Sequence, residues 1–324
     1  MRGVIILSFL FLFFTVYTQE ITVKDSLLVI RKNPEKGFQH DYILFIPEGT
    51  PVNKMTCLLV EPNNTGRPSD SIEVHKRAAI DLAAVSSVGN NISTMLKIPL
   101  LVPIFPRPAS KALVYTHALD RDVMVRATGE LERLDLQLIA MIEDARNRLA
   151  IMQIETEEKV LMNGFSASAT FTNRFSYIHP ERVKALAMGG FNGELMLPQE
   201  TINGVKLNYP LGVNDFYKLF GKKFDRKVYM TIPQFIYMGK LDENDAVQFE
   251  DAYSNKERKI INTNLGREVQ ERYVKCQSIY RENEVQVIFS TFEGVGHWTT
   301  SEVNFEVIKF FFNQIQSKSS GKNE

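Results

Sequence analysis

Short apolar runs alternate with longer amphipathic stretches along this chain. The runs consist mainly of β-branched, aliphatic or aromatic side chains, and they cover residues 41–47, 55–62, 98–105, 159–165, 183–189, 234–239 and 285–292. Runs of this length, ended by Gly, Pro, Asn or a charged residue, predict β-strands. The clearest helix spans residues 129–152, where one apolar face is formed at three- and four-residue spacing by Leu131, Leu134, Leu138, Met141 and Ile142.

This alternation predicts one doubly wound α/β domain. Continuously apolar strands separated by helices indicate a mostly parallel sheet that is covered on both faces. The segment from Phe191 to Pro233 is different, because it shows neither period and is rich in Gly, Pro, Asn and aromatic residues. A loop this long inside a compact domain is usually functional. We expect a single domain over residues 19–324, with residues 191–233 inserted as a cap or lid.

Composition and charge narrow the classes of function. A hydrophobic fraction of 44% and a charged fraction of 23% are typical of a globular protein in water. The 38 Lys and Arg residues balance 38 Asp and Glu residues, and no basic run is interleaved with aromatic residues. This balance argues against nucleic acid as a partner.

The N-terminus predicts export. Residues 1–20 read MRGVIILSFLFLFFTVYTQE, in which one arginine precedes a long apolar run and then small or polar residues, the outline of a secretory signal peptide. The alternative is an uncleaved anchor, but the apolar run is shorter than the roughly 20 residues that a membrane span needs. We expect residues 1–18 to be removed, the protein to be secreted or periplasmic, and no stable membrane insertion.

The two cysteines are expected to remain unpaired. Cys57 lies in an apolar strand run and Cys276 in a charged helical stretch, so a disulfide between them is the weaker alternative even in an exported protein. Asn63 and Asn91 each begin an N-x-S/T triplet, which matters only if the source glycosylates its proteins.

The stretch VLMNGFSASATF, residues 160–171, contains a candidate nucleophile. Ser166 follows a predicted buried strand, and a helix is predicted from about Ala167, so the serine lies at a strand-to-helix turn. A nucleophile elbow has this position, needs small flanking residues such as Gly164 and Ser168, and directs a helix N-terminus at the new negative charge. The alternative is that Ser166 is one more small side chain, because G-x-S-x-S is common and lacks the usual final glycine.

A serine nucleophile needs a base and an orienting carboxylate. His297 lies on the glycine-rich turn FEGVGHW after the last predicted strand, from which it can reach across the strand ends. Asp242 and Asp245 follow the strand of residues 234–239, which gives the chain order Ser, Asp, His. We favour Asp242, which is closer to the strand end, and expect Asp245 to cap a helix that begins near Ala246.

The other histidines are expected to be surface groups or groups behind the site rather than bases; they are His40, His75, His117 and His179. An oxyanion hole needs backbone N–H groups from the loop after an early strand and from the residue after the nucleophile. Asn63, Asn64 and Ala167 are the candidates. A turn rich in Asn, Thr and Gly also occurs without a catalytic purpose.

These motifs together resemble the α/β-hydrolase superfamily, and within it the secreted esterase and polyhydroxybutyrate-depolymerase-like branch. The resemblance covers most of the chain after the N-terminal segment and rests on VEPNNTGRPSD, LVPIFPRP, YTHALDRD, NGFSASATFTNRFSYIHPERVKALAMGG, YMGKLDENDAV and FEGVGHW, in that order. It implies that Ser166 is the nucleophile, His297 the base and an aspartate within residues 240–245 the third member of a triad.

The sequence therefore predicts a secreted serine hydrolase that cleaves a carboxylic ester, small or polymeric, through an acyl-enzyme on Ser166. No metal or cofactor is expected, because neither the residue spacing of a zinc site nor a glycine-rich phosphate loop occurs. A serine peptidase with the same triad is one alternative. A noncatalytic binding protein that keeps the fold is another, since fold alone does not establish activity.

Overall fold

A computed structural model describes residues 24–85 and 87–316 of this chain. The predicted signal peptide, residues 1–18, lies outside the described residues. The centre of the molecule is an eight-stranded sheet, whose strands in spatial order are β1 (Ser26–Ile30), β2 (Tyr42–Ile46), β5 (Leu100–Pro103), β4 (Leu59–Val60), β7 (Val160–Phe165), β8 (Val183–Gly189), β11 (Gln234–Gly239) and β12 (Val287–Phe292).

The sheet is mostly parallel. β1 pairs antiparallel with β2, and β2 pairs antiparallel with β5, whereas every pairing from β5 to β12 is parallel. A separate parallel pair is formed by β3 (Met55–Thr56) and β6 (Glu155–Thr156). The carboxyl ends of the parallel strands therefore meet at one edge of the sheet, which is where open α/β sheets place their sites.

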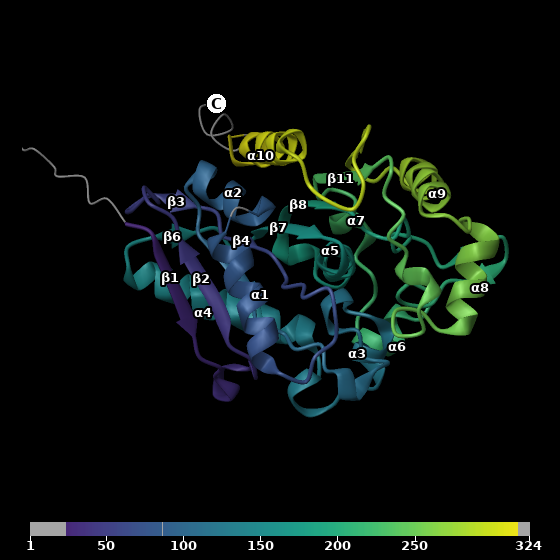
Figure 1. Ribbon diagram of the computed structural model, residues 1–324, viewed down its shortest axis with the longest axis horizontal. Coiled ribbons are helices and arrows are strands. Elements are labelled where there is room, and N and C mark those ends of the chain that lie inside the picture. The colour runs from purple at the N-terminus through teal and green to yellow at the C-terminus, as the bar shows by residue number, and fades with distance from the viewer. Residues whose placement is uncertain (1–23, 86, 317–324) are drawn as a thin grey trace, which may run out of the picture.

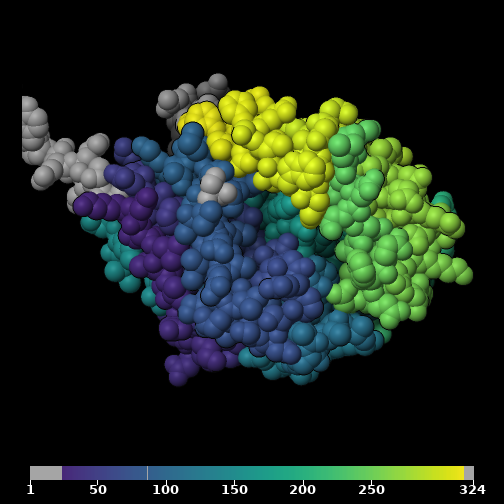
Figure 2. Space-filling view, in the orientation of Figure 1, coloured from purple at the N-terminus to yellow at the C-terminus, as the bar shows by residue number. Residues whose placement is uncertain are grey.

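Helices cover both faces of the sheet, as Figure 1 shows. One face packs against α1 (Ile72–Ala84), α2 (Val88–Leu96) and α10 (Ser301–Gln316), with Ala79, Ile92 and Val307 among the buried contacts. The other face packs against α4 (Leu134–Ile151), α5 (Ala167–Ile178) and α9 (Val269–Glu282), which share a second core. In the space-filling view of Figure 2, the yellow C-terminal helix lies along the blue part that contains α2.

The sequence pattern predicted most of these elements. All seven apolar runs contain strands of the sheet, and the run of residues 55–62 is divided between β3 and β4. The predicted apolar face of α4 is confirmed, because Leu134, Leu138 and Met141 are fully buried. The pattern did not predict β1, a five-residue edge strand in which Leu27, Leu28 and Val29 stay partly exposed.

Residues 191–233 form little regular secondary structure but contribute many buried side chains to the core. They contain the hairpin of β9 (Thr201–Ile202) and β10 (Val205–Lys206), α6 (Phe216–Phe220) and α7 (Arg226–Tyr229). Tyr209, Phe216 and Tyr229 are buried in the same core as α5, and the Tyr229 ring centroid lies 4.0 Å from that of Tyr177. That the segment acts as a lid stays a prediction.

Two further features concern the chain as a whole. Both cysteines are buried and free, as the sequence predicted. Within residues 24–85 and 87–316, no helix is long and apolar enough to cross a membrane. The remaining helices are α3 (Arg121–Val125) and α8 (Asn255–Asn264), with short 3₁₀ turns between elements.

Candidate active site

Ser166 occupies a strained turn between β7 and α5. Its backbone lies at φ 61° and ψ −126°, a region that residues other than glycine rarely adopt. Strained conformations of this kind cluster at functional sites. Gly164 permits the tight turn, since a Cβ there would lie 2.4 Å from the carbonyl oxygen of Ser168. The Ser168 hydroxyl accepts from the Phe165 N–H at 2.9 Å and donates to the Phe165 oxygen at 2.8 Å. Ser168, at the position where the motif usually has glycine, thus stabilises the end of β7 through these two hydrogen bonds.

His297 lies on the loop that follows β12 and faces the serine. Its Nε2 is 3.1 Å from Ser166 Oγ, a hydrogen-bonding distance. The loop can approach the end of β11 because Gly239 has no side chain; a Cβ there would lie 2.4 Å from the Val295 oxygen. The Leu241 N–H donates to that same oxygen at 2.8 Å and fixes the loop.

Asp242 holds the other side of the imidazole. The Nδ1 of His297 lies 3.0 Å from Asp242 Oδ2 and 3.2 Å from Oδ1. The Asp242 side chain is fully buried and also accepts the Asn244 N–H at 3.0 Å. Asp245 has a different role: it accepts the Val247 N–H at 2.9 Å at the start of a 3₁₀ turn and pairs with the buried Arg272 at 2.6 Å. The structure therefore places Asp242 rather than Asp245 beside the histidine.

The predicted oxyanion donors differ in their surroundings. Ala167 begins α5 and lines the hollow beside Ser166, so its N–H is one of those that a helix leaves without an internal acceptor. The Asn63 side chain is hydrogen-bonded to the main chain of Phe105 and not to the oxyanion position: it donates to the Phe105 oxygen at 2.9 Å and accepts the Phe105 N–H at 3.1 Å. The Asn64 side chain accepts the Gly66 N–H at 3.0 Å. Any contribution from Asn63 or Asn64 would therefore come from the backbone.

Known structures share this arrangement of strands. One is poly(aspartic acid) hydrolase-1 from Sphingomonas sp. KT-1, at a TM-score of 0.57 and 14% identity over 89% of this chain and 97% of that one. Another is a poly(3-hydroxybutyrate) depolymerase from Bordetella parapertussis, at a TM-score of 0.56 and 13% identity over 90% of each chain. The chain has the α/β-hydrolase fold. No protein-family model and no curated protein sequence matches it.

The remaining four histidines lie inside the protein. Of the two expected alternatives, surface groups or groups behind the site, the surface alternative is excluded, because His40, His75, His117 and His179 are all buried. His75 and His117 support the loop after β4: their Nδ1 atoms lie 3.2 and 3.4 Å from the Thr65 hydroxyl. Burial lowers the pKa of His117 to about 3. His75 and His117 therefore lie behind the candidate oxyanion loop.

Sequence reasoning missed the wall of the hollow beside Ser166. The hollow measures about 30 Å³ and is lined from α5 by Ala167, Thr170 and Arg174, with Tyr115 and Tyr253 among its other walls. Ser166, Thr170 and Arg174 recur every four residues, so they share one face of α5. That spacing was the available signal, although an arginine on a helix is usually exposed to solvent.

Proposed function

We propose that this protein is a serine hydrolase that cleaves carboxylic esters. The proposal rests on one observation, the unbroken series of hydrogen-bonding distances from Asp242 through His297 to Ser166 at a strained strand-to-helix turn. The resemblance of the fold to an esterase and depolymerase branch supports it. The fold alone would not, because hydrolase folds also occur without activity.

The geometry supports acyl transfer in two steps. Ser166 Oγ attacks the ester carbonyl carbon while its proton passes to His297 Nε2, and the resulting oxyanion accepts the Ala167 N–H and a second N–H from the loop after β4. The C–O bond to the alcohol breaks as the imidazolium returns its proton to the leaving oxygen. Water then attacks the acyl-enzyme by the same route and releases the acid. Asp242 orients His297 and stabilises the imidazolium.

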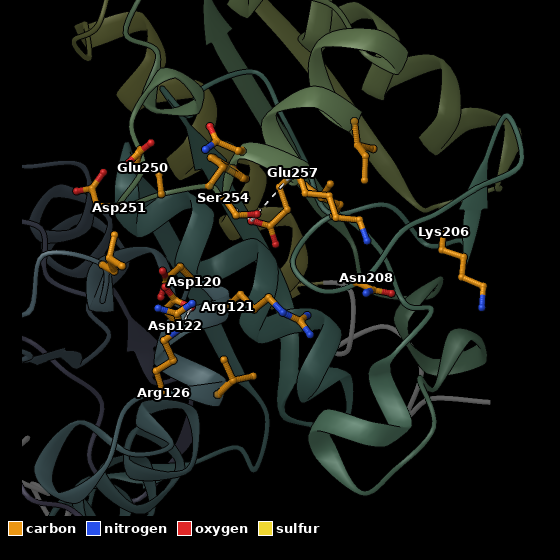
Figure 3. A pocket seen from close by; sticks show the side chains of 18 residues that line it. Asp120, Arg121, Asp122, Arg126, Lys206, Asn208, Glu250, Asp251, Ser254 and Glu257 are labelled. Carbon is orange, nitrogen blue, oxygen red and sulfur yellow. Dashed lines mark hydrogen bonds and ion pairs between the residues drawn. The ribbon is translucent and has the colours of Figure 1, made fainter.

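A large cleft lined by many charged residues adjoins the small hollow beside Ser166. Its size and lining favour a substrate that has a bulky polar part. The cleft measures about 480 Å³ and shares Ala252 and Tyr253 with the hollow. Figure 3 shows that acidic and basic side chains from several segments line the cleft, among them Asp120, Arg121, Asp122, Arg126, Lys206, Glu250, Asp251 and Glu257. We propose that a short acyl group occupies the hollow and that the rest of a small or polymeric ester lies in this cleft.

We also propose that the protein is exported, on the N-terminal sequence pattern alone. Sequencing the N-terminus of the protein recovered from its source would test this. A start near residue 19 supports export with cleavage. A start at Met1 contradicts cleavage and favours the uncleaved anchor or a protein that is not exported.

Labelling and hydrolysis assays test the function together. A fluorophosphonate probe should label the wild type and not Ser166→Ala, and the labelled peptide should contain residue 166. Wild-type protein should hydrolyse p-nitrophenyl acetate or butyrate, with turnover lost by several orders of magnitude in Ser166→Ala, as triad deletions cost about 10⁶-fold in subtilisin. Hydrolysis of a peptide library and of no ester would favour the peptidase alternative. No labelling and no turnover in folded protein would favour a binding protein.

A further inference from the structure

Arg174 is a buried cation that lines the same hollow as Ser166. Its side chain is only 2% exposed. An arginine has five N–H groups, and the guanidinium makes two hydrogen bonds within the described chain, to the Ala118 oxygen at 2.9 Å and to the Tyr253 hydroxyl at 3.0 Å. Both acceptors are neutral. Three of the five N–H groups therefore form no hydrogen bond to the described residues and are free to donate to a ligand.

The nearest carboxyl groups favour the charged form of Arg174 but accept no hydrogen bond from it. Glu194 Oε2 lies 4.0 Å from the guanidinium, beyond hydrogen-bond distance, and instead accepts the Tyr253 hydroxyl at 2.6 Å. Burial raises the pKa of Glu194, and burial raises the pKa of Asp120, the other carboxyl that senses Arg174, to about 7. Burial therefore favours the neutral form of both carboxyl groups. The guanidinium therefore has N–H groups that can donate to an anionic ligand.

The position of Arg174 relative to Ser166 sets the length of that ligand. Ser166 precedes the first residue of α5, and Arg174 lies about two turns into the helix, roughly 12 Å further along its axis at 1.5 Å per residue. The Arg174 side chain reaches back toward Ser166, because helical side chains point toward the N-terminus. Both residues line the hollow of about 30 Å³. An acyl group bound to Ser166 would therefore extend along α5 toward the guanidinium.

We propose that this hollow is a carboxylate-binding acyl subsite, so that the preferred substrates are half-esters of short dicarboxylic acids. The ester carbonyl lies at Ser166, and the far carboxylate accepts hydrogen bonds from Arg174, whose planar fork matches two carboxylate oxygens. This inference rests on the proposed ester hydrolysis and names its acyl group. The residue acts on specificity and takes no part in the bond-breaking steps.

Matched methyl esters test the subsite directly. Monomethyl succinate and methyl levulinate have acyl chains of similar length, but the first ends in a carboxylate and the second in a methyl ketone. Wild-type kcat/KM, measured by acid release at constant pH, should favour monomethyl succinate by about tenfold to a hundredfold, the worth of a hydrogen bond to a charged group. Arg174→Gln should bring the ratio close to one, and Arg174→Lys should retain part of it. Arg148→Gln, which removes an arginine from the outer side of α4, should keep the wild-type ratio.

A second measurement needs no variant and covers the case in which Arg174 variants do not fold. Succinate should inhibit wild-type hydrolysis of methyl levulinate competitively, and levulinate should inhibit at least about tenfold less well. If the wild type hydrolyses methyl levulinate and methyl valerate as fast as monomethyl succinate, and succinate does not inhibit, the carboxylate subsite is overturned while ester hydrolysis stands. If no ester is hydrolysed, the proposed function itself fails.

Discussion

The carboxylate of Asp242 lies 3.0 Å from His297 Nδ1, whereas Asp245, three residues later, forms its ion pair with Arg272. Only a carboxylate within hydrogen-bond reach of Nδ1–H can fix the tautomer that leaves Nε2 free to accept the serine proton. The Gln270 amide donates to the main-chain oxygens of Asp242 and Gly239, both at 3.0 Å, and holds the turn in place. The two aspartates therefore have different partners although they lie three residues apart in the sequence.

Substitution of each aspartate by asparagine should separate these roles. Asp242→Asn should lower kcat by about 10⁴-fold, the loss that the equivalent change causes in a chymotrypsin-like protease, with the fold preserved. Asp245→Asn should leave kcat within a few-fold of wild type, because asparagine still accepts the Val247 N–H. Steady-state kinetics on one p-nitrophenyl ester, with circular dichroism as the control for folding, compares them. A severe loss at residue 245 with near-normal turnover at residue 242 would reverse the assignment.

The sequence made the strands and the three polar residues predictable for one physical reason. Buried parallel strands must be continuously apolar, and parallel strands bring their carboxyl ends to one edge, so Ser166, Asp242 and His297 converge wherever their strands lie in order. Arg174 could not be predicted in this way. Its burial depends on Tyr253 and Glu194, which come from loops distant in sequence. The burial of His75 and His117 likewise depends on Thr65 and on the contact between the two rings, whose centroids lie 5.4 Å apart.

The tyrosines of residues 191–233 test whether this segment belongs to the core. Tyr229 is fully buried, its tilted ring lies with its centroid 4.0 Å from that of Tyr177, and its hydroxyl lies 3.3 Å from the Tyr280 hydroxyl. Tyr217 in the same segment is 67% exposed. Tyr229→Ala should lower the free energy of unfolding by about 3 kcal/mol or more, the usual cost of removing a buried aromatic ring. Tyr217→Ala should change it by less than about 0.5 kcal/mol. Urea unfolding measures both, and equal small effects would show that the segment folds loosely on the rest.

An ion pair holds the segment of residues 244–253 over the hollow. Arg107, on the loop after β5, pairs with Asp251 at 2.5 Å and lies over the Tyr115 ring at 3.5 Å from its centroid. Asn244, Ala246, Ala252 and Tyr253 from this segment line the hollow. The pair therefore ties one wall of the hollow to the opposite loop.

Loss of this pair should widen the range of acyl chains accepted. In Arg107→Gln and in Asp251→Asn, the ratio of kcat/KM for p-nitrophenyl hexanoate to that for the acetate should rise several-fold, because the wall moves away more easily. The double variant should resemble either single variant, since both remove the same contact. Additive effects, or a ratio that does not change, would show that the pair leaves the hollow unaffected.

Glu61 should make stability depend on pH. It follows β4, is completely buried, and accepts the Asn163 amide at 2.7 Å. Gly89 leaves room for it, since a Cβ there would lie 2.0 Å from Glu61 Oε2. Burial raises the pKa of Glu61 from 4.5 to about 7. Between these two pH values the folded protein binds more protons than the unfolded chain, so the free energy of unfolding falls as the pH rises through this window.

Glu61→Gln should remove that part of the dependence, because the amide is uncharged throughout and its oxygen can still accept from Asn163. The pKa difference corresponds to roughly 3 kcal/mol at 1.36 kcal/mol per pKa unit. Relative to wild type, the variant should therefore be more stable at pH 8 than at pH 5 by an amount of that order, as measured by urea unfolding at both pH values. The comparison between variant and wild type cancels the contribution of Asp120, whose pKa burial also raises to about 7. Glu73→Gln, at an exposed position on α1, is the control and should follow the wild-type curve. Parallel curves for wild type and Glu61→Gln would mean that Glu61 stays ionised in the folded protein.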